Sequence, residues 1–179
     1  TISANQTQTE PNTTAHFGAS GDCGIAKATR NATSHEFEFA LDHKAAYLVF
    51  KPYTNDDILK HCYLTKIEVT SDNDITTTST YTYTLDPTAD TGAGALTGTG
   101  NGKQIVLETK GSGAYTNGFP LTNTSANLTT NGAYMVIKPG THTLRIRYWV
   151  KDVATNIEGT ITKIIPSHTF AKNEYVNME

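Results

Sequence analysis

The nine residues Thr143-Leu-Arg-Ile-Arg-Tyr-Trp-Val-Lys151 decide the fold class of this chain. Apolar and polar side chains alternate along the segment, with Leu144, Ile146, Tyr148 and Val150 on one face and Arg145, Arg147, Trp149 and Lys151 on the other. Successive side chains of a β-strand point to opposite faces, so this period of two predicts a strand with one buried face. A polar loop at 152–158 and a second strand at 159–165, closed by Pro166, are expected to follow.

Similar runs recur along the whole chain at intervals of about ten residues, the spacing typical of sandwich folds. Alternation predicts a strand at 36–41 with Phe37, Phe39 and Leu41 inward, and one at 63–70 with Tyr63, Thr65, Ile67 and Val69 on one face. The apolar run 45–50 predicts a central strand. Further strands are expected at 15–19, 80–85, 95–96, 103–109 and 133–138. We therefore predict an all-β sandwich with almost no helix.

The composition agrees with a β-protein and excludes some functions. The 179 residues include about thirty threonines, nine tyrosines and fourteen glycines, which favour strands and tight turns. With a net charge of −3, no basic patch suggests a nucleic-acid partner. The longest apolar stretch, 45–50, is far shorter than the roughly 20 residues of a membrane span. We expect a flexible polar leader at 1–15 and one domain at 16–179, in a trimmed or mature chain without a signal peptide.

Neither a catalytic nor a cofactor site is evident in the sequence, and we expect no enzyme. The six histidines, at 16, 35, 43, 61, 142 and 168, are scattered, and no nucleophile or phosphate-binding motif is present. The acidic segment Asp72-Asn73-Asp74 invites a calcium interpretation. Thr77 and Tyr83, however, stand where a calcium loop of the EF-hand type needs glycine and a carboxylate. The segment 55–57 is better explained as the cap of one helical turn at 55–60, with Asn55 as the capping residue.

The sequence allows two interpretations of the cysteine pair and two interpretations of a charged stripe on the strand at 143–151. Cys23 and Cys62 form a disulfide, which would stabilise the fold by about 3–4 kcal/mol, or they are two unrelated thiols. The stripe of Arg145, Arg147, Trp149 and Lys151 is a surface that binds a glycan or a protein through the indole, or Trp149 is covered by a neighbouring element.

The end of the chain has a characteristic order of elements. The strand at 143–151, a loop and a Thr-rich strand are followed by the motif Phe170-Ala-Lys-Asn-Glu-Tyr175 and a last short run. Together with Asp42-His-Lys-Ala-Ala-Tyr-Leu-Val-Phe50 and Leu64-Thr-Lys-Ile-Glu-Val-Thr-Ser71, this order resembles the N-terminal domain of the fimbrillin family (FimA-like and Mfa-like). Fimbrillins build the surface pili of Bacteroidetes-type bacteria. The resemblance extends over residues 35–178.

The resemblance implies a transthyretin-like β-sandwich of Greek-key type with about seven to ten strands, followed in the family by a second sandwich. It implies a structural, non-catalytic subunit of fimbriae that serves in cell adhesion, without cofactor or metal. Its partners would be other fimbrial subunits and a host or bacterial surface protein or glycan. The protein would lie at the cell surface or outer membrane as an exported lipoprotein, anchored only through an upstream lipid that this chain does not contain.

In that family, proteolysis removes the first strand and a strand of the next subunit fills the groove. Mapped onto this chain, the removed strand lies near 16–19 and Arg30 is the trypsin-like processing site, in the polar stretch 29–33. Arg30 as an ordinary loop arginine is the alternative, because polar loops tolerate cleavage generally. The competing function is a cell-surface carbohydrate-binding module, with Trp149 and nearby tyrosines as stacking residues.

Overall fold

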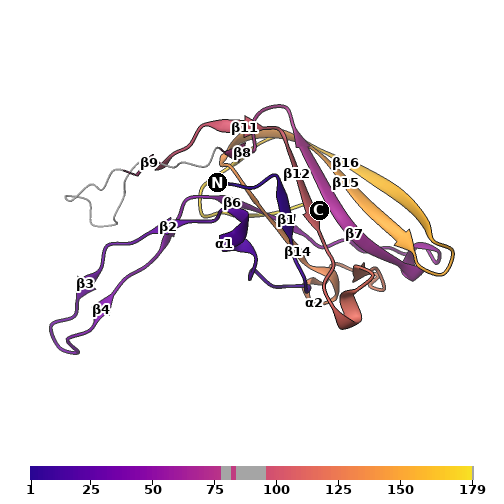
Figure 1. Cartoon of the computed structure of the whole chain (residues 1–179), viewed down its shortest axis with the longest axis horizontal. Helices are drawn as coiled ribbons and strands as arrows, with labels where there is room; N and C mark the ends of the chain where they lie inside the picture. The colour runs from indigo at the N-terminus through magenta and orange to yellow at the C-terminus, as the bar shows by residue number, and fades with distance from the viewer. Residues whose placement is uncertain (78–81, 84–95, 179) are drawn as a thin grey trace.

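The computed structural model describes residues 1–77, 82–83 and 96–178, and in them the chain is almost entirely strand and loop (Figure 1). This confirms the all-β class. The helical elements of the described residues are α1 (Phe17–Ser20), η1 (Leu59–His61), η2 (Gly113–Tyr115) and α2 (Leu128–Asn131). The strand expected at 80–85 lies mostly outside the described residues. Of it, Thr82–Tyr83 forms β9, which pairs with β10 (Leu96–Thr97).

Two packed sheets form the body of the molecule. The large sheet has the order β1 (Asn5–Thr7), β12 (Gln104–Glu108), β7 (Cys62–Ser71), β15 (Gly140–Asp152) and β16 (Ile157–Phe170), and β13 (Phe119–Pro120) also pairs with β7. Its neighbours are antiparallel except β1 and β12. The small sheet has the order β14 (Ala133–Ile137), β6 (Ala46–Phe50) and β17 (Tyr175–Asn177). A further two-stranded ladder joins β8 (Thr76–Thr77) to β11 (Gly100–Gly102).

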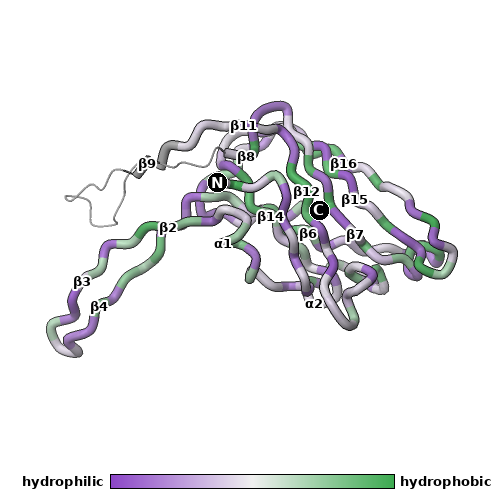
Figure 2. Tube along the Cα trace, viewed as in Figure 1, coloured by the Kyte–Doolittle hydropathy of each residue, from purple (hydrophilic) through white to green (hydrophobic). Residues whose placement is uncertain are grey.

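The core lies between these sheets. Every residue of β6 and β14 is buried, which confirms the predicted central strand at 45–50. Figure 2 shows these two strands as largely hydrophobic segments. On the side of the small sheet away from the large one, Phe17 of α1 stacks on Tyr47 with ring centroids 4.8 Å apart. The inward face of the large sheet supplies alternate side chains, among them Leu64, Ile67, Val69, Ile105, Leu107, Leu144 and Ile146.

The long hairpin of β15 and β16 follows the predicted alternation, with one correction at its end. Leu144, Ile146 and Val150 are buried, whereas Arg145 on the opposite face is exposed. The second strand does not end at Pro166 but continues to Phe170. Pro166 lies where the pairing of β16 with β15 shifts, between Ile165 and His168. A bulge in an edge strand tolerates a proline, which lacks an N–H.

In β7 the predicted face is correct only in its second half. Ile67 and Val69 are buried, but Leu64 is buried in place of Thr65, and Cys62 in place of Tyr63. The reason is a β-bulge against β15, where Trp149 lies opposite Lys66 and the next residue, Val150, lies opposite Leu64. The extra residue of a bulge shifts the alternation by one, and a simple period of two does not reveal it.

Three other expectations are wrong. The polar leader contains β1 and is held against the body, with Ile2 only 1 % exposed. The strand expected at 15–19 is instead the short helix α1, in which Phe17 is buried. The segment 36–41 does not face the core, since Phe37 and Phe39 are 66 % and 68 % exposed. It belongs to an arm that lies outside the two layers, so neither of the two described sheets covers its apolar face.

This arm comprises residues 24–43 and projects from the body (Figure 1). It is a hairpin in which β2 (Gly24–Ile25) pairs with β5 (Asp42–His43) and β3 (Thr29–Arg30) pairs with β4 (Phe37–Glu38). Its base is fixed to the small sheet through Asp22, whose carboxylate accepts a hydrogen bond from the Tyr47 hydroxyl at 2.6 Å and contacts His43 Nδ1 at 2.8 Å.

The buried His142 makes the stability of the fold depend on pH. Its Nε2 donates to the Lys138 carbonyl oxygen at 3.0 Å, its Nδ1 contacts Asn73, and its ring stacks on Phe170. Burial lowers the pKa of His142 below the usual 6.5. The unfolded chain therefore binds a proton more readily than the folded one as the pH falls through 6.5.

We expect the free energy of unfolding to decrease between pH 7 and pH 5, and His142→Gln to reduce this slope because it removes the titrating group. Urea denaturation at a series of pH values measures the slope. The matched control is His61→Gln, since His61 is exposed at the end of η1. Equal slopes for the wild type and His142→Gln would contradict the prediction.

Candidate functional site: the N-terminal strand and the arm

The first strand, β1, lies at the edge of the large sheet beside β12. The two are parallel and paired over three residues, from Asn5 opposite Val106 to Thr7 opposite Glu108. At the ends of this ladder Val106 N donates to the Ala4 carbonyl oxygen at 2.8 Å, and Gln8 N donates to the Glu108 carbonyl oxygen at 2.9 Å. A ladder this short consists of main-chain bonds that another extended segment could equally form.

Two glutamine side chains of this segment bind the edge of the other sheet. Gln6 exchanges two hydrogen bonds with the main chain of Val136, at 2.7 and 2.9 Å. Gln8 accepts from Tyr134 N at 2.8 Å and donates to the Gly132 carbonyl oxygen at 2.9 Å. A glutamine amide carries the same donor and acceptor as a peptide group. Gln6 and Gln8, which we call the glutamine clamp, thus act as a neighbouring strand for β14.

The rest of the N-terminal segment is held by a few further contacts. The buried Ile2 donates through its N–H to Thr77 Oγ1 at 2.9 Å, and Ser3 N donates to the Ser20 carbonyl oxygen at 3.0 Å. His16 Nε2 donates to the Tyr134 carbonyl oxygen at 2.9 Å. The segment therefore closes one side of the sandwich mainly through hydrogen bonds, with Ile2 and Phe17 as its apolar anchors.

Arg30 lies in β3, the outer part of the arm, and is exposed. Its guanidinium donates to His35 Nδ1 at 2.7 Å across the hairpin. Arg30 follows β1 and α1 in the chain and precedes β6. Cleavage after Arg30 would therefore separate the whole N-terminal segment covalently from the body. The strand that this would release is β1, not the segment near 16–19 that the sequence suggested.

The charged stripe lies on the outer face of the large sheet, as the alternation predicts, but it is not an open platform. Arg145 is exposed, whereas Arg147 lies 3.6 Å from the Glu68 carboxylate and Lys151 is half-buried. Lys66 Nζ sits 4.0 Å from the centroid of the Trp149 ring. Among the described residues, no other aromatic ring contacts Trp149. One face of the indole is covered and it has no partner ring for stacking a sugar.

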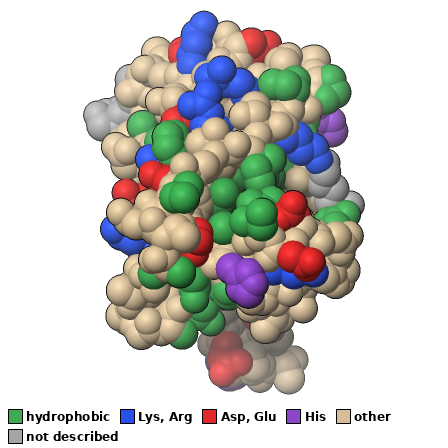
Figure 3. All heavy atoms as spheres, turned by 90° about the vertical axis from the view of Figure 1, so that its right-hand side faces the viewer, with side chains coloured by type: hydrophobic (Ala, Val, Ile, Leu, Met, Phe, Trp, Pro, Cys, Tyr) green, Lys and Arg blue, Asp and Glu red, His purple; other side chains and the backbone are tan. Residues whose placement is uncertain are grey.

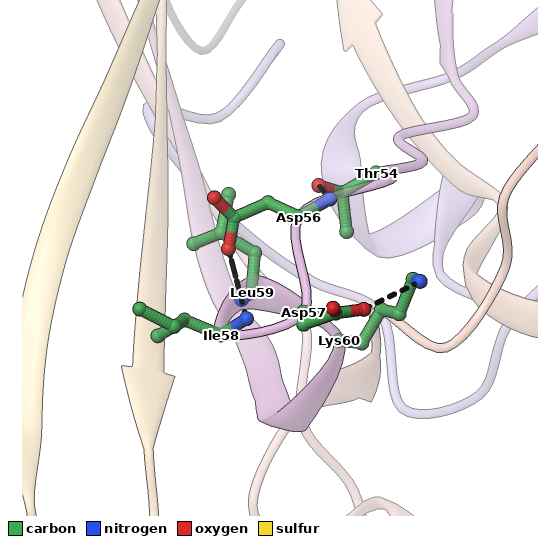
Figure 4. Close-up of polar contacts among 6 residues, drawn as sticks. All are labelled: Thr54, Asp56, Asp57, Ile58, Leu59 and Lys60. Carbon is green, nitrogen blue, oxygen red and sulfur yellow. Dashed lines mark hydrogen bonds and ion pairs between the residues drawn. The ribbon is translucent and has the colours of Figure 1, made fainter.

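The acidic clusters serve local structure. In the segment 54–60, Asp56 rather than Asn55 is the cap, since its Oδ1 accepts from the N–H groups of Ile58 and Leu59 at 2.8 and 3.0 Å (Figure 4). The neighbouring Asp57 pairs with Lys60 at 3.0 Å. Asp72 Oδ1 accepts from Thr143 N at 3.0 Å and so connects β7 to the start of the hairpin. In the described part of the chain, no three acidic, histidine or cysteine side chains converge as metal ligands would.

Both cysteines are free thiols in the structure, which agrees with the second interpretation and not with a disulfide. Cys62 is buried at the start of β7, and Cys23 is half-buried next to the arm. Burial raises the pKa of both thiols, so neither is activated as a nucleophile.

The glutamine clamp is the part of this site that sequence reasoning missed. The signal was present in Asn5-Gln6-Thr7-Gln8-Thr9, where glutamine recurs at every second position. A period of two marks a strand even when the inward residues are polar, provided that they find partners. The main-chain partners of these glutamines lie about 125 residues further along the chain, in β14 and the residue before it. A local sequence pattern cannot predict contacts at that distance.

No protein-family model and no curated protein matches this chain. None of the helices that the structure describes has the length and apolar character needed to span a bilayer.

We expect Gln8→Leu to lower the free energy of unfolding by about 1 to 3 kcal/mol, because it leaves the buried Tyr134 N–H without a partner and an unsatisfied buried group costs roughly 1–3 kcal/mol. The Gly132 carbonyl oxygen keeps its hydrogen bond from Asn12 N. Chemical denaturation followed by circular dichroism measures the change. Gln104→Leu is the matched control, since Gln104 is exposed on the adjacent strand β12. An unchanged stability of Gln8→Leu would show that the clamp does not hold the edge of β14.

Proposed function

We propose that this protein is a structural subunit of surface fimbriae that assembles by strand exchange and serves in cell adhesion. The observation that carries the proposal is the way in which β1 is held. An exchangeable strand must be bound through contacts that another strand can restore. The main-chain ladder to β12 and the hydrogen bonds of the clamp to β14 meet this requirement.

The position of Arg30 supports the same proposal. It is exposed on a hairpin outside the body, where a protease can bind it in an extended conformation, and the main chain around it contributes nothing to the core. After cleavage, residues 1–30 would be retained only by non-covalent contacts. Their loss would uncover the edges of β12 and β14 together, and unpaired edges of this kind are templates for a strand from another molecule.

The sequence resemblance to fimbrillins leads to the further parts of the proposal. We place the protein at the cell surface or outer membrane, with other fimbrial subunits as its partners. We assign the two-sheet arrangement to the transthyretin-like sandwiches of Greek-key type. Strand exchange in this setting needs neither a metal nor a cofactor.

Limited digestion with an arginine-specific protease tests the proposal. We expect selective cleavage after Arg30, release of residues 1–30 and a ladder of oligomers on native gels. N-terminal sequencing identifies the cut, and mass spectrometry after gel filtration shows whether the fragment has left. Arg30→Gln is the control and is expected to stay intact and free of the ladder.

A synthetic peptide of residues 1–20 makes the test specific for the vacated edge. We expect it to rebind the cleaved protein and suppress the ladder. The same peptide with Gln6→Leu and Gln8→Leu should do so at least about tenfold less well, because it cannot satisfy the edge of β14. A cleaved protein that retains residues 1–30 and remains a monomer would contradict strand exchange.

A further inference from the structure

An apolar groove with a volume of about 510 Å³ opens beside β16, the last strand of the large sheet. The inner faces of β7, β15 and β16 supply its floor, with Leu64, Tyr148, Val150 and Ile161. Figure 3 looks onto the end of the molecule that carries the β15–β16 hairpin and shows hydrophobic side chains gathered in a hollow. A concave, mainly apolar site of roughly 300–1,000 Å³ is the usual form of a small-molecule site in proteins.

The described chain builds this groove but does not fill it. Ile161 lies opposite Tyr148 on the inner face of the large sheet, yet it is 45 % exposed. A cavity of about 150 Å³ accepts one benzene ring, so the groove has room for roughly three such volumes, enough for an alkyl chain of about twelve carbons. An apolar molecule of that size would remove Ile161 from water.

One charged side chain of the groove has no partner to neutralise it. Lys163 lies opposite Ile146, so it is on the inner, apolar face of β16, where it is half-buried. Among the described residues it makes neither a hydrogen bond nor an ion pair, whereas Lys51, which also lines the groove, has an interaction of its own. Withdrawing an ammonium group from water without a partner costs free energy, which an anion bound in the groove would offset.

The Tyr148 hydroxyl is a second donor beside Lys163. Tyr148 pairs with Ile161 and Lys163 with Ile146, so the two are diagonal neighbours on one face of the β15–β16 ladder. Diagonal neighbours lie roughly 7–8 Å apart, within reach of a shared ligand group. The Tyr148 ring packs edge-on against Phe50, with centroids 6.1 Å apart, and the hydroxyl has no hydrogen-bond partner in the described part of the chain. Burial raises the pKa of Tyr148, so the hydroxyl stays a neutral donor.

Lys163 also disfavours a β-strand as the occupant of the groove. A charged side chain that points inward on an edge strand is one of the devices by which proteins prevent another strand from pairing with that edge. A sugar or a nucleotide would bring many polar groups against an apolar floor, where they would lack partners. A small molecule with one anionic group and an apolar body satisfies both the lysine and the floor.

We propose that the groove binds an amphipathic carboxylate, a small molecule with an apolar chain and one carboxylate group, of which a fatty acid is the simplest example. The chain lies over Leu64, Val150 and Ile161. The carboxylate pairs with Lys163 and accepts a hydrogen bond from Tyr148, and such charge-assisted bonds are among the stronger ones in proteins. The site is separate from the edge of β1 and needs no cleavage at Arg30.

Calorimetric titration of the intact protein with dodecanoate, below its micellar concentration, tests the site. We expect one dodecanoate to bind per chain. Dodecyltrimethylammonium has the same chain and the opposite head charge, and it should bind at least about tenfold more weakly because it meets Lys163 with a like charge. Acetate, which has the carboxylate without the chain, should show no measurable binding.

Substitutions locate the bound molecule. Lys163→Met should weaken dodecanoate binding at least about tenfold, and Tyr148→Phe about three- to tenfold, since each removes one hydrogen bond to the carboxylate. Ile161→Glu should abolish binding by placing a carboxylate in the groove. The matched controls are Lys110→Met and Ile164→Glu, because Lys110 is exposed outside the groove and Ile164 is exposed on the other face of β16. Both should bind normally, and circular dichroism verifies that every variant is folded.

Several results would overturn the proposal. Absence of dodecanoate binding, equal affinities for the two dodecyl compounds, or full binding by Lys163→Met would each show that no carboxylate site exists. If Lys163→Met self-associates in sedimentation velocity but still binds dodecanoate normally, the lysine only protects the edge of β16. Self-association of the wild type that Ile161→Glu abolishes and Ile164→Glu does not would identify another protein copy as the occupant. None of these results affects the digestion experiment.

Discussion

The structure depends on one mismatch: a sheet of three strands packs against a sheet of six. β6 and β14 form the buried layer, and their apolar side chains stabilise the core by about 25 cal/mol for each Å² removed from water. Three strands cannot cover the whole of the larger sheet, so its inner face extends past the small sheet on both sides. On one of these two sides other residues of the chain cover the exposed part of the large sheet, and on the other side apolar residues stay exposed.

On one side the chain closes the gap with its own first residues. β1 extends the large sheet, while Gln6 and Gln8 reach across to the small one. A buried strand edge without partners costs far more than the net gain of an ordinary hydrogen bond. The glutamine clamp therefore stabilises the fold mainly because its removal would leave buried main-chain groups at the edge of β14 without hydrogen-bond partners. On the other side nothing comparable covers Ile161, and the described structure keeps an apolar groove there.

The sequence predicts the layers well and their boundaries poorly. The alternation at 143–151 and the apolar run at 45–50 identify strands correctly. Positions that are buried on one or both faces of a strand carry apolar residues, so the burial can be seen in the sequence. The face of β7 changes at Thr65 because a bulge depends on the partner strand. Phe37 and Phe39 are a second case in which the local sequence does not reveal the tertiary surroundings. Their alternation is that of a half-buried strand, but no element of the described residues covers them. Periodicity does not say whether another element lies over an apolar face.

Cleavage at Arg30 would also change the arm. Arg30 lies on one of its strands and is paired with Phe37 on the other. If the chain were cleaved at Arg30 and residues 1–30 left, β2 and β3 would leave with them, and the remaining strand, 31–43, would lose its hairpin partner. That strand would keep its attachment at Lys44 and gain a free row of main-chain donors and acceptors beside Phe37, Phe39 and Leu41. One cleavage would thus open a strand edge on the side of β1 and leave a second unpaired edge in the arm, and both edges could accept a strand from another molecule.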